Sequence, residues 1–399
     1  MANDPVLTRC LESGWRRVAF IGLTKHAGKT TALNAFIAAA EEADKSIGLC
    51  SIGLDGERLD TVLGVEKPAV YVPAGTIVAS AERALEQTNA KLEWLEELPI
   101  PSPLGPVMLA RVTAPGQVLL AGVRQRRHVE LVMGRLADYH VDFSLVDGAF
   151  DRIAAAAPHL VDAAVVAIGA TAAAMVGTSA PPATGPGGYG AASGNGAAGR
   201  IGTPGGTAVS GGNGAAGGNG IAGIVRLAAA FFRRFQLPEV SDEIRSVLKP
   251  AHDSGQIGIW DGEKLQLLPS HQTLLGLDLG SSAKLDTAPI QTVYVPGALT
   301  DGVCQQLTGI GQSETFQIVV AHQEQVLASE QTLKPLFRSG RQVTVWTPLP
   351  IVAVAVNPRS ILGYDVSWEE LASELARLAP NLLFYDALKG RTLNPSGGI

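Results

Sequence analysis

Aromatic and charged side chains are scarce in this chain. They make up 5% and 17% of its 399 residues, whereas hydrophobic residues make up 46%. The apolar fraction is therefore largely Ala, Val and Leu, which argues against a chain that is disordered throughout. Basic and acidic side chains number 31 and 37, for a net charge of -6. The chain thus lacks the overall positive field that holds a nucleic-acid backbone, and we expect no nucleic-acid partner.

Cysteine is rarer still. The three cysteines, Cys10, Cys50 and Cys304, lie far apart in the sequence and form no CxxC pair. This odd, scattered set does not indicate a disulfide framework and fits a reducing compartment. The histidines show no HxxxH or HExxH spacing, so the sequence indicates no zinc site.

Long hydrophobic runs are also missing. Residues 1–17 include Asp4, Glu12 and three arginines, and they contain no apolar stretch of signal-peptide length. Residues 163–181 are uncharged, but they are mostly Ala, Gly, Thr and Ser, which contribute little transfer energy. The segment therefore favours a buried strand followed by a linker over a membrane span. We expect a cytoplasmic protein with no membrane partner.

A glycine-rich tract at residues 176–223 divides the chain. Its 48 residues hold 18 of the 46 glycines and a single charged residue, Arg200. Such a segment cannot bury enough apolar surface to offset its backbone entropy. We expect a low-complexity linker or loop that carries no chemistry. On either side of it we expect a domain at 1–175 and a C-terminal α/β region at 224–399.

Short β-branched runs alternate with helical stretches along the chain. This alternation indicates an α/β fold with a mainly parallel sheet that helices cover on both faces. Whether the strands after the tract complete the first sheet or form their own stays open. The predicted strands before the tract are 17–21, 46–52, 107–112, 118–121, 141–146 and 163–168, and the predicted helices are 29–43 and 126–139. After the tract the pattern predicts a helix at 222–235 and strands at 292–295, 316–320, 342–346, 351–356 and 382–385.

The motif GLTKHAGKT at residues 22–30 is the strongest functional signal. It fits the pattern GxxxxGK[ST], directly follows a predicted strand and opens a predicted helix. The glycines let the backbone curl so that successive N–H groups point at a phosphate, and the helix N-terminus adds partial positive charge. We therefore predict a phosphate-binding loop in a P-loop NTPase domain. The alternative is an ordinary glycine-containing turn between a strand and a helix.

Individual residues of the motif have separate predicted roles. Lys29 is expected to reach the β- and γ-phosphates, and the Thr30 hydroxyl is expected to ligate Mg²⁺. Thr24 stands where the deviant form of this loop has a signature lysine, so dimerisation through such a lysine is not indicated. The remaining residues that we predict to bind the nucleotide are Gly22, Lys25, His26, Ala27, Gly28 and Thr31.

A P-loop NTPase also needs a carboxylate, usually at the end of a neighbouring buried strand, to hold Mg²⁺ and to position water. The mainly apolar run at 141–147 ends in Asp147, our first candidate for catalysis and metal binding. A solvated turn residue is the alternative. Asp55, after the second predicted strand, is a further candidate for metal binding, with a turn or helix N-cap role as its alternative.

The sequence contains no NKxD box, the motif that reads guanine in many GTPases, so ATP is favoured over GTP. Asn357 follows the apolar strand 351–356, at the strand end where ligands of open α/β sheets gather. It is a candidate for contacting the base, and an Asn-Pro turn is the alternative. Four arginines are candidates for stabilising transition-state charge unless they only solvate a helix face: Arg124, Arg126, Arg127 and Arg152.

Four sequence words together resemble one family. They are GLTKHAGKTT at 22–31, LVDGAFDR at 145–152, VDAAVVAIGA at 161–170 and AVAVNP at 353–358. They are similar to the ATPase subunit of the lysine 5,6-aminomutase reactivase, a P-loop protein found with the adenosylcobalamin-dependent aminomutase of lysine fermentation. The resemblance touches about residues 16–170 and 289–387, and the glycine-rich tract departs from it. Only the first word is specific by itself, and it specifies a nucleotide rather than a pathway.

The resemblance implies an ATP-driven factor that acts with a MutS-like partner subunit to exchange damaged cobalamin on the mutase. Gly22, Gly28, Lys29 and Thr30 carry over as nucleotide and Mg²⁺ contacts, as does Asp147, whereas no cobalamin ligand carries over. Two other functions stay open. One is an ATP-dependent ligase resembling dethiobiotin synthetase, in which the γ-phosphate activates a carboxylate for attack by an amine. The other is a regulatory nucleotide sensor with negligible turnover.

Overall fold

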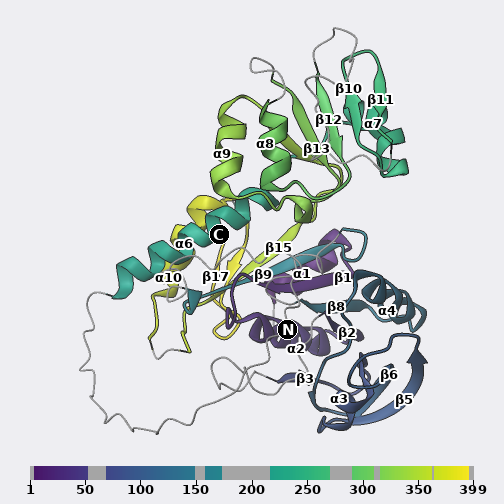
Figure 1. Ribbon diagram of the computed structural model, residues 1–399. Coiled ribbons are helices and arrows are strands. Elements are labelled where there is room, and N and C mark those ends of the chain that lie inside the picture. Colours follow the sequence, from purple (N-terminus) through teal and green to yellow (C-terminus); the bar gives the residue numbers. More distant parts are fainter. Residues whose placement is uncertain are drawn as a thin grey trace, which may run out of the picture.

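Three sheets organise the computed structural model, which describes residues 4–52, 69–148, 158–172, 216–269, 290–309, 315–361 and 364–394 (Figure 1). The first sheet has ten strands, the second has five, and a small third sheet pairs β3 (Val70–Val72) with β7 (Gly116–Val118). In spatial order the first sheet consists of β17 (Thr392–Leu393), β16 (Phe384–Tyr385), β15 (Ile351–Asn357), β9 (Ala163–Gly169), β1 (Arg17–Gly22), β8 (Phe143–Gly148), β2 (Ile47–Ile52), β4 (Ile77–Ala81), β6 (Val107–Ala114) and β5 (Lys91–Leu98).

The first sheet is mostly parallel, as predicted. All neighbouring pairs from β16 through β4 are parallel. The strands β17, β6 and β5 join through antiparallel pairs at the two sides of the sheet. The central strands β2 and β9 are buried along their whole length, which is typical of parallel strands covered on both faces.

Helices cover both faces of the first sheet, and the alternation of strand side chains explains why. On β1, Val18 and Phe20 belong to one apolar cluster, whereas Ala19 and Ile21 belong to another. The first cluster packs against α1 (Pro5–Ser13) and α2 (Lys29–Glu42). The second packs against α4 (Arg126–Asp138), α6 (Ala216–Phe235) and α10 (Trp368–Leu378). A short helix, α3 (Glu82–Glu86), follows β4.

The second sheet has its own apolar core. Its strands, in spatial order, are β11 (Leu265–Leu267), β10 (Gly258–Trp260), β12 (Thr292–Val295), β13 (Gln317–Val320) and β14 (Gln342–Val345). The last three are parallel. Residues of α8 (Asp301–Gly309) and α9 (Glu330–Arg338) pack on one face, and residues of α7 (Asp242–Ser254) pack on the other.

The chain after the glycine-rich tract contributes to both sheets, which answers the question that the sequence left open. Strands β10 to β14 form the second sheet, and β15 to β17 then complete the first. Because the chain passes from Val345 into the amino end of β15 at Ile351, the second sheet lies toward the amino ends of the parallel strands (Figure 1). We call the first sheet with its helices the first part of the molecule, and the second sheet with its helices the second part. Ion pairs from Arg126 to Glu324 and from Arg233 to Glu330 connect the two parts.

Two predicted elements differ from the structure by more than two residues at one end. The predicted strand 118–121 is wrong because β7 ends at Val118; beyond it, the Ala121 carbonyl accepts only a single backbone bond, from Ala81. The helix predicted from residue 222 begins at Ala216, within the segment 176–223 that we expected to be a linker. Burial of Ile221 and Ile224 against the first sheet accounts for helical structure at this glycine-rich end. Residues 176–215 lie outside the described residues.

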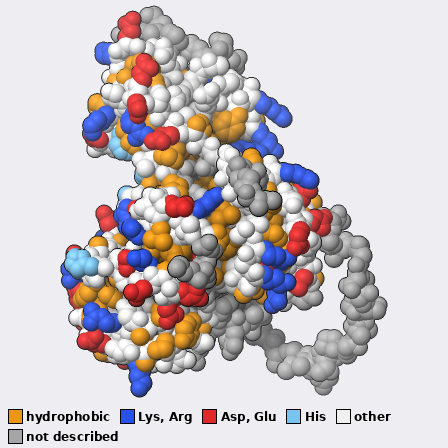
Figure 2. All heavy atoms as spheres, turned by 180° about the vertical axis from the view of Figure 1, so that it is seen from behind, with side chains coloured by type: hydrophobic (Ala, Val, Ile, Leu, Met, Phe, Trp, Pro, Cys, Tyr) orange, Lys and Arg blue, Asp and Glu red, His pale blue; other side chains and the backbone are white. Residues whose placement is uncertain are grey.

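Charged side chains of both signs are interspersed on the face drawn in Figure 2, over both parts of the molecule. Within the described residues of this face, no broad area carries a single sign. Among the helices of the described ranges, none combines the length and the hydropathy that a bilayer span requires.

Candidate functional site

The loop between β1 and α2 curls at the carboxyl end of β1. It begins where the Leu23 N–H donates to the Ala167 carbonyl on the neighbouring strand β9, at 2.8 Å. Two of its residues, His26 with φ 57° and Gly28 with φ 95°, are in the left-handed region, which reverses the chain within a few residues. The strand, loop and helix thus follow one another as the motif predicted.

Glycine is required at two points where this loop meets its neighbours. A Cβ atom on Gly28 would lie 2.9 Å from the Cβ of Asn357 and 3.1 Å from its amide nitrogen. A Cβ atom on Gly169, at the end of β9, would lie 2.9 Å from both the Cα and the carbonyl oxygen of Ala27. The loop is therefore packed against the carboxyl ends of β9 and β15, and its shape depends on both glycines.

The N-terminus of α2 presents backbone N–H groups at this edge of the sheet. The first bond within the helix runs from Ala32 N–H to the Gly28 carbonyl, at 3.0 Å. The amides of Lys29, Thr30 and Thr31 precede this bond and have no carbonyl to reach within the helix. The first turn contains no acidic side chain. The helix end therefore carries partial positive charge that suits an anion.

Lys29 and Asp147 meet directly in front of this helix end. The Lys29 Nζ lies 2.7 Å from Asp147 Oδ1 and donates a 2.6 Å hydrogen bond to the Gly148 carbonyl. The side chains are 23% and 15% exposed, so solvent screens the pair only in part. Within the described residues, Asp147 Oδ1 accepts no hydrogen bond beyond this ion-pair contact. The carboxylate and the Gly148 carbonyl thus fix the ammonium group at the carboxyl edge of the sheet.

The position of Asp147 follows from the pairing of β8. Asp147 is in register with Phe20 on β1 and Ser51 on β2. Strand β8 therefore lies between β2 and β1, the strand that leads into the loop. Burial, helped by the charge of Asp147, raises the pKa of the neighbouring Cys50 thiol to about 12. Cys50 therefore stays protonated at neutral pH.

The other predicted residues are placed as follows. Ala27 is buried, Thr30 and Thr31 are half-buried, and Lys25 is exposed, all within the loop or the first turn of α2. Asp55 and Arg152 lie outside the described residues. Arg126 forms its ion pair with Glu324 of the second part, and Arg124 and Arg127 are exposed at the start of α4.

Three contributors to the site were missed in the sequence. The Gly148 carbonyl and Gly169 act through the tertiary contacts described above, and nothing in their local sequence announces these contacts. The Thr24 side chain is 4% exposed, and its hydroxyl oxygen has no hydrogen-bond partner in the described part of the chain. The sequence offers no signal for this burial, because Thr24 is followed directly by the polar residues Lys25 and His26.

No cluster of three or more His, Cys, Asp or Glu side chains that could hold a metal ion forms within the described ranges. Comparison of the chain with protein-family models, with curated proteins and with solved structures found no match. The chemistry of the site therefore follows from its own geometry: an open helix N-terminus, one lysine and one carboxylate at the carboxyl edge of a parallel sheet.

Proposed function

We propose that this chain is an ATP-binding P-loop ATPase whose residues 22–30 hold the triphosphate. The observation that supports this most directly is the 2.7 Å contact between Lys29 and Asp147. The two residues come from separate sequence signals, a loop motif and a strand-end acid, that P-loop NTPases combine at one site.

The residues present fit a nucleotide with its Mg²⁺ ion. Backbone amides at the N-terminus of α2 suit phosphate oxygens, and Gly28 lets the loop lie closer to Asn357 than a side chain would allow. The Asp147 carboxylate and the Thr30 hydroxyl are oxygen donors of the kind that Mg²⁺ prefers. When bound, MgATP supplies the transferable phosphoryl group and the charge of the metal.

The protein's own part in this reaction is an exchange of partners. Lys29 leaves Asp147 for the phosphate oxygens, since several negative charges attract its ammonium group more strongly than one. Asp147 would then be available to hold the metal or to orient the attacking water. Because the exchange requires the anion, Asp147 becomes available only when nucleotide is present.

We further propose that ATP hydrolysis drives reactivation of an adenosylcobalamin-dependent lysine 5,6-aminomutase together with a MutS-like partner subunit. The support for this step is the resemblance carried by the four sequence words. Their strands are neighbours in the order β15, β9, β1 and β8, so the four words converge on one edge of the first sheet. This convergence supports a common site for them, and the pathway rests on the resemblance.

Nucleotide binding and turnover test the first proposal. We expect the purified chain to bind MgATP by titration calorimetry and to release phosphate. Substitution Lys29→Ala removes the point charge from the phosphates, and we expect it to lower kcat/KM by about 100-fold or more. The control is Lys334→Ala, an exposed lysine on α9, which is expected to retain full activity. Undiminished binding and hydrolysis in Lys29→Ala would refute the site.

Reactivation tests the second proposal. The chain and its partner subunit are added with MgATP to aminomutase that has been inactivated through its cobalamin. We expect recovery of mutase activity with wild-type protein and none with Lys29→Ala. If a competent partner is present and wild-type protein restores nothing, the reactivase assignment is wrong even where ATP is hydrolysed.

A further inference from the structure

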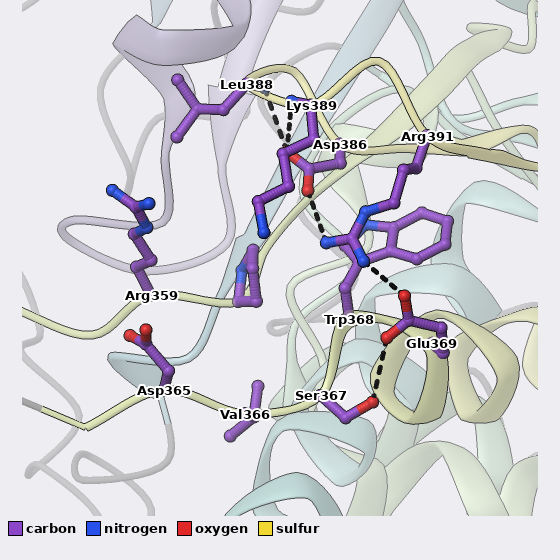
Figure 3. Close-up of a pocket in the computed structure, with 11 residues that line it drawn as sticks. Arg359, Asp365, Val366, Ser367, Trp368, Glu369, Asp386, Leu388, Lys389 and Arg391 are labelled. Atoms are coloured by element: carbon purple, nitrogen blue, oxygen red, sulfur yellow. Dashed lines mark hydrogen bonds and ion pairs between the residues drawn. The ribbon is translucent and has the colours of Figure 1, made fainter.

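A cavity of about 260 Å³ lies near the loop, at the carboxyl edge of the first sheet. Two segments line it: residues 358–359 and 365–369 after β15, and residues 386–391 after β16 (Figure 3). Ligands of open α/β sheets gather at this edge. Nothing in the loop motif accounts for the cavity.

The cavity is connected to the loop through Asn357. This residue packs against Gly28, and its neighbours Pro358 and Arg359 line the cavity. Between β1 and β15 lies only β9. At the usual strand spacing, the cavity segments therefore begin about 10 to 15 Å along the edge from the end of β1. If the loop holds the triphosphate, the nucleoside of the same nucleotide would lie at a similar distance from the end of β1.

Two residues that line the cavity, Trp368 and Arg391, each have a buried hydrogen-bond donor with no partner among the described residues. Trp368 is 6% exposed, and its indole N–H has no partner in the described part of the chain. The guanidinium of Arg391 lies over the indole ring, 4.9 Å from the ring centroid. Its terminal nitrogens pair with Asp386 and Glu369, but its Nε also lacks a described partner. Because unmatched buried donors cost free energy, these groups favour a ligand that brings acceptors.

The rest of the lining fits a flat, partly apolar ligand. Pro358, Val366 and Leu388 contribute apolar surface, and the Trp368 ring with the Arg391 guanidinium forms a stacked pair (Figure 3). Four of the eleven lining residues are apolar, and six of the other seven are charged. The cavity thus offers apolar surface together with hydrogen-bond donors and acceptors, a combination that suits a small ligand. A nucleoside has this character: a flat base with ring-nitrogen acceptors, joined to a sugar with oxygen acceptors.

Asn357 itself is already engaged within the protein. Its side-chain oxygen accepts the Arg359 N–H at 3.2 Å, and its Cβ and amide nitrogen lie against Gly28. We therefore propose that the cavity holds the base and ribose of the nucleotide, and that Trp368 and Arg391 select this ligand while Asn357 braces the loop. The proposal rests on the proposed function, because it assigns the nucleoside of the same bound triphosphate.

The test compares MgATP with magnesium tripolyphosphate, which has the phosphates but no nucleoside. Wild-type protein is expected to bind MgATP at least tenfold more tightly. Val366→Phe fills the cavity, so it is expected to remove this preference while leaving the Kd for tripolyphosphate within about twofold. Trp368→Phe deletes the indole N–H and keeps a ring, so it is expected to weaken MgATP alone by about three- to tenfold. The matched control is Trp94→Phe, on the edge strand β5, with no expected change in either Kd.

A second measurement reports on the cavity directly. We expect MgATP, but not tripolyphosphate, to change the intrinsic tryptophan fluorescence of wild-type protein, and we expect Trp368→Phe to lose most of that change. Thermal unfolding shows whether each variant is folded, and Trp368→Phe provides the test if Val366→Phe does not fold.

The outcomes separate the two proposals. If tripolyphosphate and MgATP bind equally well, or if folded cavity variants keep the wild-type preference for MgATP, the cavity does not hold the nucleoside and this inference is overturned while the ATPase proposal stands. If the cavity instead holds a carboxylic acid substrate beside bound MgATP, cavity variants are also expected to keep the preference for MgATP. Binding of such an acid would favour the ligase. If neither phosphate ligand binds, the proposed function fails and the nucleoside assignment fails with it.

Discussion

The two sheets of this protein share an architecture and differ in what closes their carboxyl ends. Each contains parallel strands between helices. In the second sheet, the Gln325 side chain donates to the Pro296 carbonyl at 2.8 Å and accepts the N–H groups of Ala321 and His322 at 2.8 and 3.3 Å. One amide thus satisfies the backbone at the ends of β12 and β13. Gln325 belongs to the single-turn helix η3 (Gln323–Gln325).

At the corresponding ends of the first sheet, no such side chain caps the α2 N-terminus, whose cap residue is Gly28. The charged groups Lys29 and Asp147 stand in front of it instead. The comparison indicates that the carboxyl edge of a parallel sheet is not enough to make a binding site. A binding site also requires backbone N–H groups that have no hydrogen-bond partner within the protein. The following predictions test that contrast.

The largest effect is expected from Gly28→Ala. The substitution forces a side chain into the left-handed region and against Asn357, so it shifts the loop that positions the phosphates. We expect nucleotide affinity or turnover to fall by about 100-fold. Gly255→Ala is the matched control, because Gly255 in the second part also has a positive φ but has open space around its Cβ position. It is expected to cost about 1 kcal/mol of stability with unchanged ATP binding. Equal effects on ATP binding would contradict the prediction.

An effect of similar size distinguishes two partly exposed ion pairs. Asp147→Asn is expected to lower kcat by about 100-fold, because the carboxylate no longer holds metal or water. It is expected to preserve or tighten nucleotide binding, because Lys29 no longer has to leave an anion. Glu324→Gln weakens the pair with Arg126 between the two parts and is expected to affect stability alone. The measurements are steady-state phosphate release and calorimetric Kd, and a weaker Kd in Asp147→Asn would show that the exchange of partners is wrong.

A smaller effect is expected at the carboxyl ends of β12 and β13 in the second sheet. Gln325→Ala leaves two backbone N–H groups and one carbonyl without their partner, which is expected to lower the free energy of unfolding by about 1 to 3 kcal/mol. Urea unfolding gives this value, and the Kd for MgATP is expected to remain unchanged. If Gln325→Ala keeps normal stability but alters ATP binding, Gln325 contributes to a binding site rather than to the stability of the second sheet.

The smallest effect concerns pH. Burial lowers the pKa of His322 to about 4, with the nearby His159 and Arg126 adding to the shift and a backbone hydrogen bond with Thr347 opposing it. The unfolded chain binds this proton more readily, so stability is complete above about pH 6.5 and decreases as pH falls from there to about 4. His322→Gln is expected to flatten part of that decrease in denaturant midpoints measured across the range. Identical pH profiles for the two proteins would exclude this histidine as a source.

The centre of the first sheet could be predicted from the sequence, because strands buried on both faces are nearly continuous apolar runs. The predicted strands 17–21 and 163–168 match β1 and β9 to within one residue at each end, and 141–146 is displaced from β8 by two. Strand β5 carries no such signal. Four of its eight residues are charged and only Leu98 is buried, so its pairing with β6 defines it rather than its own pattern.

The candidate site divides in the same way. The placement of Lys29 and Asp147 at one edge of the sheet could be expected from the sequence, because the loop motif and the acid each follow an apolar strand. The contact of Asn357 with Gly28 was not, because it depends on β15 lying beside β9 across a long stretch of intervening chain. The cavity between the segments after β15 and β16 was missed for the same reason, since neither segment contains a recognisable motif.

The position of β15 also has a consequence for synthesis. Its partner β9 is made first, and about 180 residues separate the end of one from the start of the other. At roughly 5 to 20 residues per second, the ribosome takes roughly 10 to 40 s to cover that stretch. During this interval a fully apolar strand has a free hydrogen-bonding edge, which is the feature that promotes aggregation of nascent chains. The half-made protein is therefore expected to aggregate more readily than the finished one.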